Sequence, residues 1–152
     1  MIDERMQELG IVLPPVFAPA GNYLGCVVDD GLVYVAGHGP VNGREVVQGK
    51  VGRDLTVEQG QAAARMTGLS ILATLRASLG SLDRIARIVK VFGMVNVAPG
   101  FNQTPAVIDG CSDLLVEVFG EAGRHARSAV GMAELPLDIA VEIELVARLR
   151  TD

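Results

Sequence analysis

The chain has 152 residues and a mass of 16.0 kDa, with 49% hydrophobic residues, 20% charged residues and a formal net charge of −5. This length suits one hydrophobic core, so we expect a single domain over residues 1–152. The acidic balance and the small aromatic set, two tyrosines and four phenylalanines without tryptophan, argue against the basic and stacking surfaces of nucleic-acid binders.

Cysteine usage and the start of the chain indicate the cellular setting. Cys26 and Cys111 stand far apart, and the chain has no CxxC motif and no paired histidines, so we expect neither a disulfide framework nor a metal site. The acidic first residues differ from the basic start of a secretory leader. No run reaches the ~20 apolar residues of a membrane span. We therefore expect a cytoplasmic protein without a nucleic-acid or membrane partner.

The first expected strands form a hairpin. Residues 24–29 and 32–37 are apolar runs rich in β-branched residues, and they are joined by Asp30-Gly31, a pair that tolerates the positive φ of a two-residue turn. Residues 1–20 contain several prolines and show no periodicity, which predicts an irregular lead-in. Residues 44–51 place two valines between polar residues and glycines, which predicts a short third strand.

Two helices are expected further along the chain. Thr56 and Gln59 have the spacing of a capping box, residues 57–79 contain no proline, and Gly80 is a natural C-terminal stop. Thr104-Pro105 has the pattern of an N-cap residue followed by proline in the first turn, which predicts the start of a second helix.

The remaining strands complete an α+β fold. Residues 88–97, 128–135 and 139–149 read as strands, and the last alternates apolar with polar residues, which places one face in the core. We expect the last two strands to pair as a hairpin that turns near Leu137. The order of elements predicts a mixed, mainly antiparallel sheet with two helices on one face. Small and apolar residues on both sides of residues 128–135 predict a second face covered by another subunit.

Arg127 and Glu142 are the candidate functional pair. In the expected hairpin they would be neighbours on adjacent strands, where a guanidinium could hold a carboxylate beside an acid–base group. The alternative interpretation is a cross-strand salt bridge on a solvated face.

At this segment the sequence resembles a known family. Residues 126–144, ARSAVGMAELPLDIAVEIE, resemble the C-terminal signature A-R-S-x-V-x-x-A-x-L-P-x-D/G-x-x-x-E-I-E of the Rid family, also called YjgF or L-PSP endoribonuclease-like. Asn22-Tyr23 and residues 35–40 resemble the family's Pro-Tyr and V-S-G-Q-x-P motifs. The resemblance implies a chorismate-mutase-like fold, a homotrimer with three equivalent clefts between subunits, and no cofactor.

The resemblance also implies an activity and a set of site residues. The family hydrolyses reactive enamines and imines, such as 2-aminoacrylate and 2-iminopropanoate, to 2-oxo acids and ammonia. By motif position, Arg127 matches the arginine that clamps the substrate carboxylate, and Glu142 matches the glutamate near the attacking water. Tyr23 matches a tyrosine at the cleft, and Gly37 matches the residue whose backbone places substrate or water.

Some positions depart from the family pattern. Ala129 stands where a cysteine is frequent, and His38 stands where glutamine is usual; we count both among the expected substrate-binding positions. The family's asparagine on the second helix has no clear match, with Ser112 or Asp113 at about its place. His125 lies in the expected helix-to-strand loop, which favours a solvated side chain.

Two other functions stay open on the sequence. The departures favour a non-catalytic module of the same fold that binds or senses a small carboxylate. The endoribonuclease or translation-inhibitor label attached to the family would require RNA binding, against which the acidic composition argues.

Overall fold

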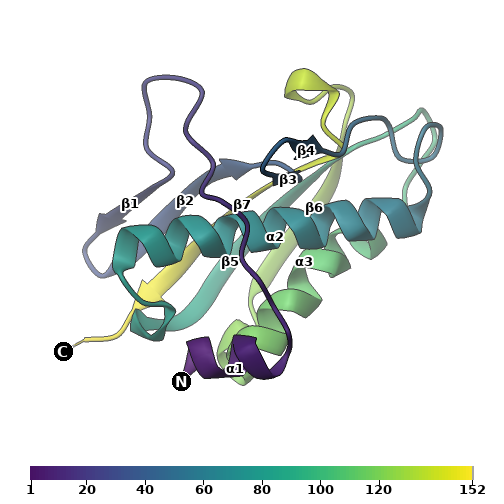
Figure 1. The fold of residues 1–152 in the computed structure, drawn as a ribbon. Coiled ribbons are helices and arrows are strands. Elements are labelled where there is room, and N and C mark those ends of the chain that lie inside the picture. Colours follow the sequence, from purple (N-terminus) through teal and green to yellow (C-terminus); the bar gives the residue numbers. More distant parts are fainter. Residues whose placement is uncertain (152) are drawn as a thin grey trace.

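The computed structural model describes residues 1–151 (Figure 1). In chain order the elements are α1 (Ile2–Glu8), β1 (Cys26–Asp29), β2 (Leu32–His38), β3 (Val41–Asn42), β4 (Glu45–Val46), α2 (Val57–Leu79), β5 (Ile85–Asn96), α3 (Thr104–Phe119), β6 (Ala126–Met132) and β7 (Val141–Leu149). Among residues 1–151, no helix has both the length and the apolar character needed to cross a bilayer.

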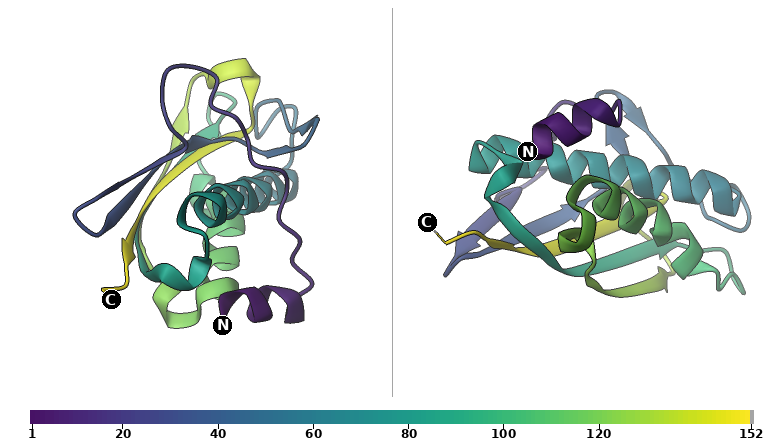
Figure 2. Two further views of the ribbon diagram at one scale, coloured as in Figure 1. Left: turned by 60° about the vertical axis from the view of Figure 1, so that its left-hand side comes forward. Right: turned by 90° about the horizontal axis from the view of Figure 1, so that it is seen from below.

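One five-stranded sheet organises the molecule. Its strand order is β1-β2-β7-β5-β6, and every neighbouring pair is antiparallel except β5 and β6, which are parallel. Helix α2 packs over β2 and β7, and α3 packs over β5 and β6. Figure 2 shows both long helices on the same side of the sheet. The expected α+β fold with a mainly antiparallel sheet and two helices on one face is confirmed.

The expected pairing of the last two strands is wrong. Strand β5 lies between β6 and β7, and it pairs with both. Residues 133–140 therefore form a connection that crosses the end of β5, with Leu137 and Asp138 both in the left-handed region at φ 56°. The alternation in β7 identified its buried face correctly, but a period of two carries no information about which strands lie alongside.

Helix α2 has the predicted bounds because its two ends carry strong local signals. The Thr56 hydroxyl accepts a hydrogen bond from the Gln59 backbone at 3.1 Å, and the Gln59 side chain accepts one from the Thr56 backbone at 2.8 Å. Gly80 closes the helix at φ +83°.

Helix α3 starts one residue differently from the expectation. Gln103 is the N-cap residue, and Thr104 is the first helical residue. The Thr104 hydroxyl, expected to cap the helix, donates instead to the Ala129 carbonyl oxygen at 3.0 Å. This contact attaches the start of α3 to strand β6.

Residues 1–20 were expected to be irregular, but they contain a helix, α1. Helix α1 forms because its acidic first turn suits a helix N-terminus and because it docks on the domain. The backbone N–H of Ile2 donates to Asp83 at 2.8 Å, and the Met6 side chain is buried. Sequence periodicity missed this helix because it is short and is held by distant contacts.

The single strand expected over residues 44–51 is also wrong. The chain forms a small hairpin instead, with β3 and β4 joined around Gly43 at φ +62°. Beyond it, Gln48 forms an isolated bridge with Ile139, and Val51 forms isolated bridges with Leu55 and Val97.

Between the helices and the sheet lies one core cluster. Its largest fully buried side chains come from α2, from α3 and from the facing strands; they include Ile71, Leu72, Leu75, Ile108, Leu114, Leu115, Ile88 and Ile143. Small residues let the two helices approach closely. A Cβ built on Gly110 of α3 would lie 2.0 Å from the Gln61 carbonyl oxygen of α2, so only glycine fits there.

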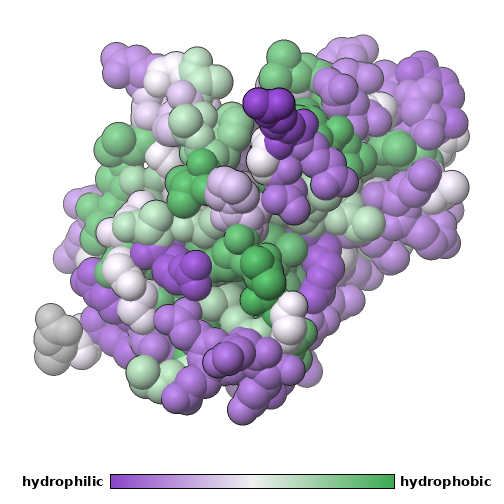
Figure 3. Space-filling model, in the orientation of Figure 1, coloured by the Kyte–Doolittle hydropathy of each residue, from purple (hydrophilic) through white to green (hydrophobic). Residues whose placement is uncertain are grey.

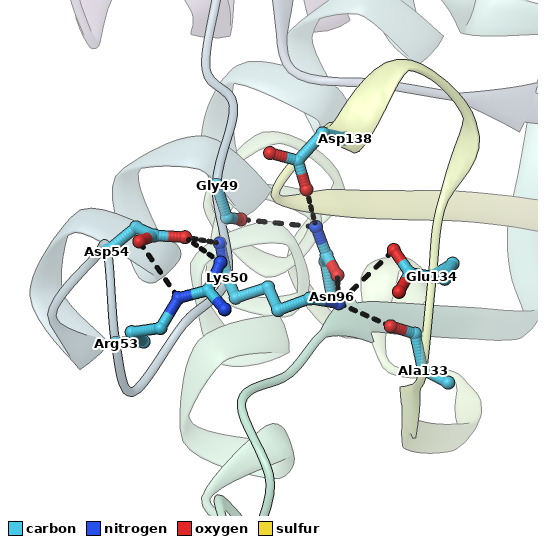
Figure 4. A network of polar contacts seen from close by, with 8 residues as sticks. All are labelled: Gly49, Lys50, Arg53, Asp54, Asn96, Ala133, Glu134 and Asp138. Carbon is cyan, nitrogen blue, oxygen red and sulfur yellow. Dashed lines mark hydrogen bonds and ion pairs between the residues drawn. The ribbon is translucent and has the colours of Figure 1, made fainter.

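A polar network fixes the loop before α2 against the end of the sheet (Figure 4). The Lys50 ammonium donates to the buried Asn96 side chain at 2.8 Å and to the Ala133 carbonyl oxygen. The Asn96 amide in turn donates to Asp138 at 2.8 Å. The network therefore ties β5 to the connection that precedes β7 and Glu142.

Hydrophilic residues dominate the end of the helix face at which this loop turns (Figure 3). Asp54 of this loop is exposed and accepts hydrogen bonds from the Arg53 guanidinium and from the Lys50 backbone N–H (Figure 4). These two contacts lower the pKa of the Asp54 carboxyl to about 2.

Candidate functional site

Arg127 and Glu142 lie on opposite faces of the sheet. Arg127 is in register with Val91, a fully buried residue under the helices. Glu142 is in register with Met94, which pairs on its other side with the exposed Val130. Laterally paired residues share a face, so Arg127 points toward α3 and Glu142 toward the face without helices. The expectation that the two side chains are neighbours within one chain is therefore wrong, because β5 separates their strands and the faces differ.

Within the described part of the chain, the Arg127 guanidinium is bonded only through Nη1. Its Nη1 donates to Asp109 Oδ1 at 2.8 Å and to Ser112 Oγ at 3.1 Å, both on α3. Neither Nε nor Nη2 has a hydrogen-bond partner among residues 1–151. Those two nitrogens form the edge with which arginine binds a carboxylate through two parallel hydrogen bonds. The arrangement is suited to anchoring an anion.

The Arg127 side chain lines a depression of about 830 Å³ on the α3 side of the molecule. Arg5 of α1 and Arg124, just before β6, lie on its walls together with Asp113 and Glu117 of α3. Its size is in the range of small-molecule sites, which run to about 1,000 Å³.

His125 belongs to the same cluster and is not the solvated loop residue that was expected. Its Nδ1 lies 2.7 Å from the Gly123 carbonyl oxygen, and its Nε2 lies 2.9 Å from Ser112 Oγ. A carbonyl only accepts, so Nδ1 carries the proton and Nε2 of the neutral ring accepts from the Ser112 hydroxyl. Burial lowers the pKa of His125, as does the nearby Arg127 charge, and the Gly123 hydrogen bond only partly opposes this. The ring is therefore neutral at pH 7.

Glu142 lies directly against Gly37. A Cβ built at Gly37 would stand 2.7 Å from Glu142 Oε2, so any side chain there would displace the carboxyl group. Burial raises the pKa of Glu142, and the neighbouring charge of Glu144 raises it further. A carboxyl group with a raised pKa is better matched to proton transfer near neutrality.

The loop that carries Tyr23 is attached to β2 close to Gly37. The Tyr23 side chain is 49% exposed, and its hydroxyl oxygen accepts from the Ala20 backbone at 3.3 Å. The carbonyl of Gly25 accepts from the Ala36 backbone at 2.9 Å, which attaches the Tyr23 loop to β2 one residue before Gly37. The structure thus brings the Tyr23 loop, Gly37 and Glu142 to one end of the sheet.

His38 and Ala129 do not lie with them. His38 is 4% exposed, with Nδ1 2.6 Å from the Ala36 carbonyl oxygen and Nε2 2.9 Å from the Thr74 hydroxyl. A register shift before His38 turns it toward α2, and burial lowers its pKa. Both ring nitrogens are engaged within the chain, which favours a structural role for His38, and its expected contact with a ligand stays a prediction. Ala129 is packed against the core, and its carbonyl accepts from Thr104.

Asp109 was not predicted from the sequence, and Ser112 was one of two residues that could stand at the place of the family's asparagine. The available signal was the spacing of these residues, because positions three apart share a face of a helix. That face could be related to Arg127 only once α3 was placed beside β6.

The raised pKa of Glu142 predicts an effect on stability. The folded protein binds this proton more tightly than the unfolded chain, so stability falls as pH rises through the folded pKa. Glu142→Gln is therefore expected to melt above wild type at pH 7, with the difference disappearing below the ordinary glutamate pKa of about 4.3. Thermal melts across pH test this. Glu45→Gln, at an exposed strand position, is the control and should show no such trend; a Glu142→Gln melting point below wild type at pH 7 would contradict the prediction.

Comparison with known proteins places this arrangement in a family. The model of the family described as "YjgF/chorismate_mutase-like, putative endoribonuclease" matches residues 3–149. The curated Protein TCP17 of Trypanosoma cruzi is 44% identical over 147 residues, which cover 95% of this chain and 92% of that protein.

Solved structures agree with the family match. A Shewanella oneidensis protein, also described as a putative endoribonuclease, superposes with a TM-score of 0.94 at 35% identity, covering 98% of this chain and 99% of its own. The YjgF gene product of E. coli superposes with a TM-score of 0.63 at 27% identity, covering 90% and 94%. The fold, the C-terminal motif and these matches together show that the chain belongs to the YjgF/Rid family.

Proposed function

We propose that this protein hydrolyses reactive imines and enamines of the 2-iminopropanoate and 2-aminoacrylate type to 2-oxo acids and ammonia, in clefts between the subunits of a homotrimer. The proposal rests mainly on the opposite orientation of Arg127 and Glu142 in one chain. A cleft that uses both side chains then takes Arg127 from one subunit and Glu142 from its neighbour.

The face of the sheet without helices supports an assembly of this kind. Val27, Tyr34 and Val130 on that face are 49%, 46% and 38% exposed. A shallow depression of about 160 Å³ on this face is lined by Tyr34, Lys90, Phe92, Glu144 and neighbouring strand residues. Exposed apolar side chains on an uncovered sheet face are typical of subunit contacts.

The chemistry follows from the two anchors. The free Nε and Nη2 edge of Arg127 binds the substrate carboxylate and orients C2 of the imine. Glu142 accepts a proton from water as the water oxygen bonds to C2 of the protonated imine and the C=N electron pair moves to nitrogen, which gives a carbinolamine. Glu142 returns the proton to the amine nitrogen. The C–N bond then breaks as the hydroxyl oxygen gives its proton to Glu142 and forms the C=O bond, so ammonia leaves the 2-oxo acid. An enamine first takes a proton from solvent at C3, which gives the same protonated imine. Gly37 leaves room for the Glu142 carboxyl, which a side chain at that position would displace.

Ammonia release from 2-iminopropanoate generated in situ tests the proposal. Wild type is expected to accelerate it, and Glu142→Gln is expected to lose about 10²–10⁴-fold in rate, the usual range for a general acid–base group. Arg127→Ala should lose activity chiefly through weaker binding, and Glu45→Gln should match wild type. Unaltered rates in both site variants would refute the assignment.

A carboxylate-binding module without turnover is the second candidate, favoured by the unoccupied edge of Arg127. The two functions separate in a thermal-shift titration with 2-oxobutanoate run beside the ammonia assay. A binding module shows saturable stabilisation with no acceleration of imine hydrolysis, whereas a hydrolase accelerates it.

A further inference from the structure

Hydrogen bonds from α3 and from the loop after it hold the Nη1 nitrogen of the Arg127 guanidinium. The two N–H bonds of Nη1 go to Asp109 and Ser112, and Ser112 is in turn bonded to His125, which is bonded to Gly123. We propose that Ser112 and His125 are positioning residues of the carboxylate site, which lock Nη1 so that the Nε and Nη2 edge faces the ligand. The proposal rests on the role of Arg127 as a carboxylate anchor.

The first support is that only the Nη1 donors of Arg127 are used within residues 1–151, while the Nε and Nη2 donors are left for a ligand. A guanidinium has five N–H bonds in one plane, and fixing the two on Nη1 fixes the plane and its rotation about the side-chain axis. The remaining edge is then presented in one orientation, so a ligand does not have to order the side chain when it binds. Arg127 is 23% exposed, which leaves that edge reachable.

The second support is the direction of each hydrogen bond. The Gly123 carbonyl accepts from His125 Nδ1 and so fixes the tautomer of the ring. The unprotonated Nε2 then accepts a hydrogen bond from the Ser112 hydroxyl. A lone pair of Ser112 Oγ is thereby directed at Arg127 Nη1, 3.1 Å away. Without His125 the Ser112 hydroxyl rotates freely, and its hold on Arg127 weakens.

The charge around the depression gives His125 a second effect. Three cations line it, Arg5 of α1, Arg124 and Arg127, and three carboxylates of α3 oppose them, Asp109, Asp113 and Glu117. With His125 neutral these lining charges cancel, and protonated His125 adds one positive charge. Affinity for a carboxylate is therefore expected to rise as pH falls through the pKa of His125, which lies below its ordinary value.

The variants Ser112→Ala and His125→Phe test the positioning role, with Ser112→Thr as the conservative variant that keeps the hydroxyl. Ser78→Ala, at an exposed position of α2, is the matched control. Calorimetric titration with 2-oxobutanoate is expected to show about tenfold weaker binding for Ser112→Ala, the usual effect of removing one hydrogen bond to a charged group. The KM for imine rises in parallel while kcat changes little, and Ser112→Thr stays near wild type. In His125→Phe the rise in affinity at low pH is absent.

Side-chain NMR of Arg127 supplies a readout that needs no ligand. Wild type should show slowly exchanging Nη1 protons and restricted rotation of the guanidinium, and both should be lost in Ser112→Ala. If wild type neither binds 2-oxobutanoate nor turns over imine, the proposed function fails while the NMR result still decides the positioning role. Wild-type affinity and unchanged Arg127 signals in folded Ser112→Ala and His125→Phe would overturn the inference.

Discussion

Mixing Arg127→Ala subunits with Glu142→Gln subunits is expected to restore imine hydrolysis that neither variant shows alone. In one chain the two side chains lie on opposite faces of the sheet, so a shared cleft draws them from different subunits. In a mixed trimer, some clefts pair the intact Arg127 of a Glu142→Gln subunit with the intact Glu142 of an Arg127→Ala subunit. Those clefts are complete, and activity returns in proportion to their number.

The experiment requires that subunits exchange, which unfolding and refolding the two variants together ensures. The control is a mixture of either variant with the double variant Arg127→Ala/Glu142→Gln, in which no cleft is complete and no activity returns. Mass spectrometry under native conditions shows whether mixed trimers formed. Mixed trimers without activity would contradict the shared cleft, and the absence of any trimer would contradict the proposed assembly.

Gly110→Ala is expected to be the most destabilising single-methyl substitution on α3. The added Cβ would stand 2.0 Å from the Gln61 carbonyl oxygen, a backbone atom of α2 that no side-chain rotation can move. The helices must separate, and the hydrogen bond from the Gln61 side chain to the Ala106 carbonyl, 2.9 Å long, is strained as well. Overpacking of this kind costs about 3 kcal/mol. For a chain of this size the melting temperature should fall by about 6–12 °C.

Thermal denaturation followed by circular dichroism measures this effect. Gly21→Ala is the matched control, because its Cβ would make only ordinary contacts with the exposed Tyr23 ring at 3.5 Å and its φ is not positive. Its melting temperature is expected to stay within about 2 °C of wild type, as for most surface substitutions. A Gly110→Ala melting temperature equal to that of the control would show that the helices separate without cost.

The sequence predicted best where local chemistry determines the structure. Thr56, Gln59 and Gly80 delimit α2 through hydrogen bonds within a few residues of the helix ends, and these signals are readable in one dimension. The buried face of β7 was predicted for a similar reason, because its alternation is set by the strand itself. Family resemblance supplied the fold type, which the family match and the superpositions confirm.

Prediction failed where position depends on distant partners. Neither Arg127 nor Glu142 carries information about β5, the strand that separates theirs, so their relation was misjudged. His38 was counted among the expected substrate-binding positions from its place in the motif, and only the register shift before it turns the ring into the core. His125 looked solvated because Ser112 lies on another element.

The buried amide of Asn96 has a consequence for how the molecule opens. Backbone bonds run from Val51 to Asn96, from Asn96 to Ala140 and from Ala140 to Val47, alongside the contacts of the Asn96 side chain with Gly49 and Asp138. The loop before α2, the end of β5 and the start of β7 therefore share one set of bonds and cannot loosen separately. They form a cooperative unit, and the segment that carries Glu142 opens only when that whole unit does.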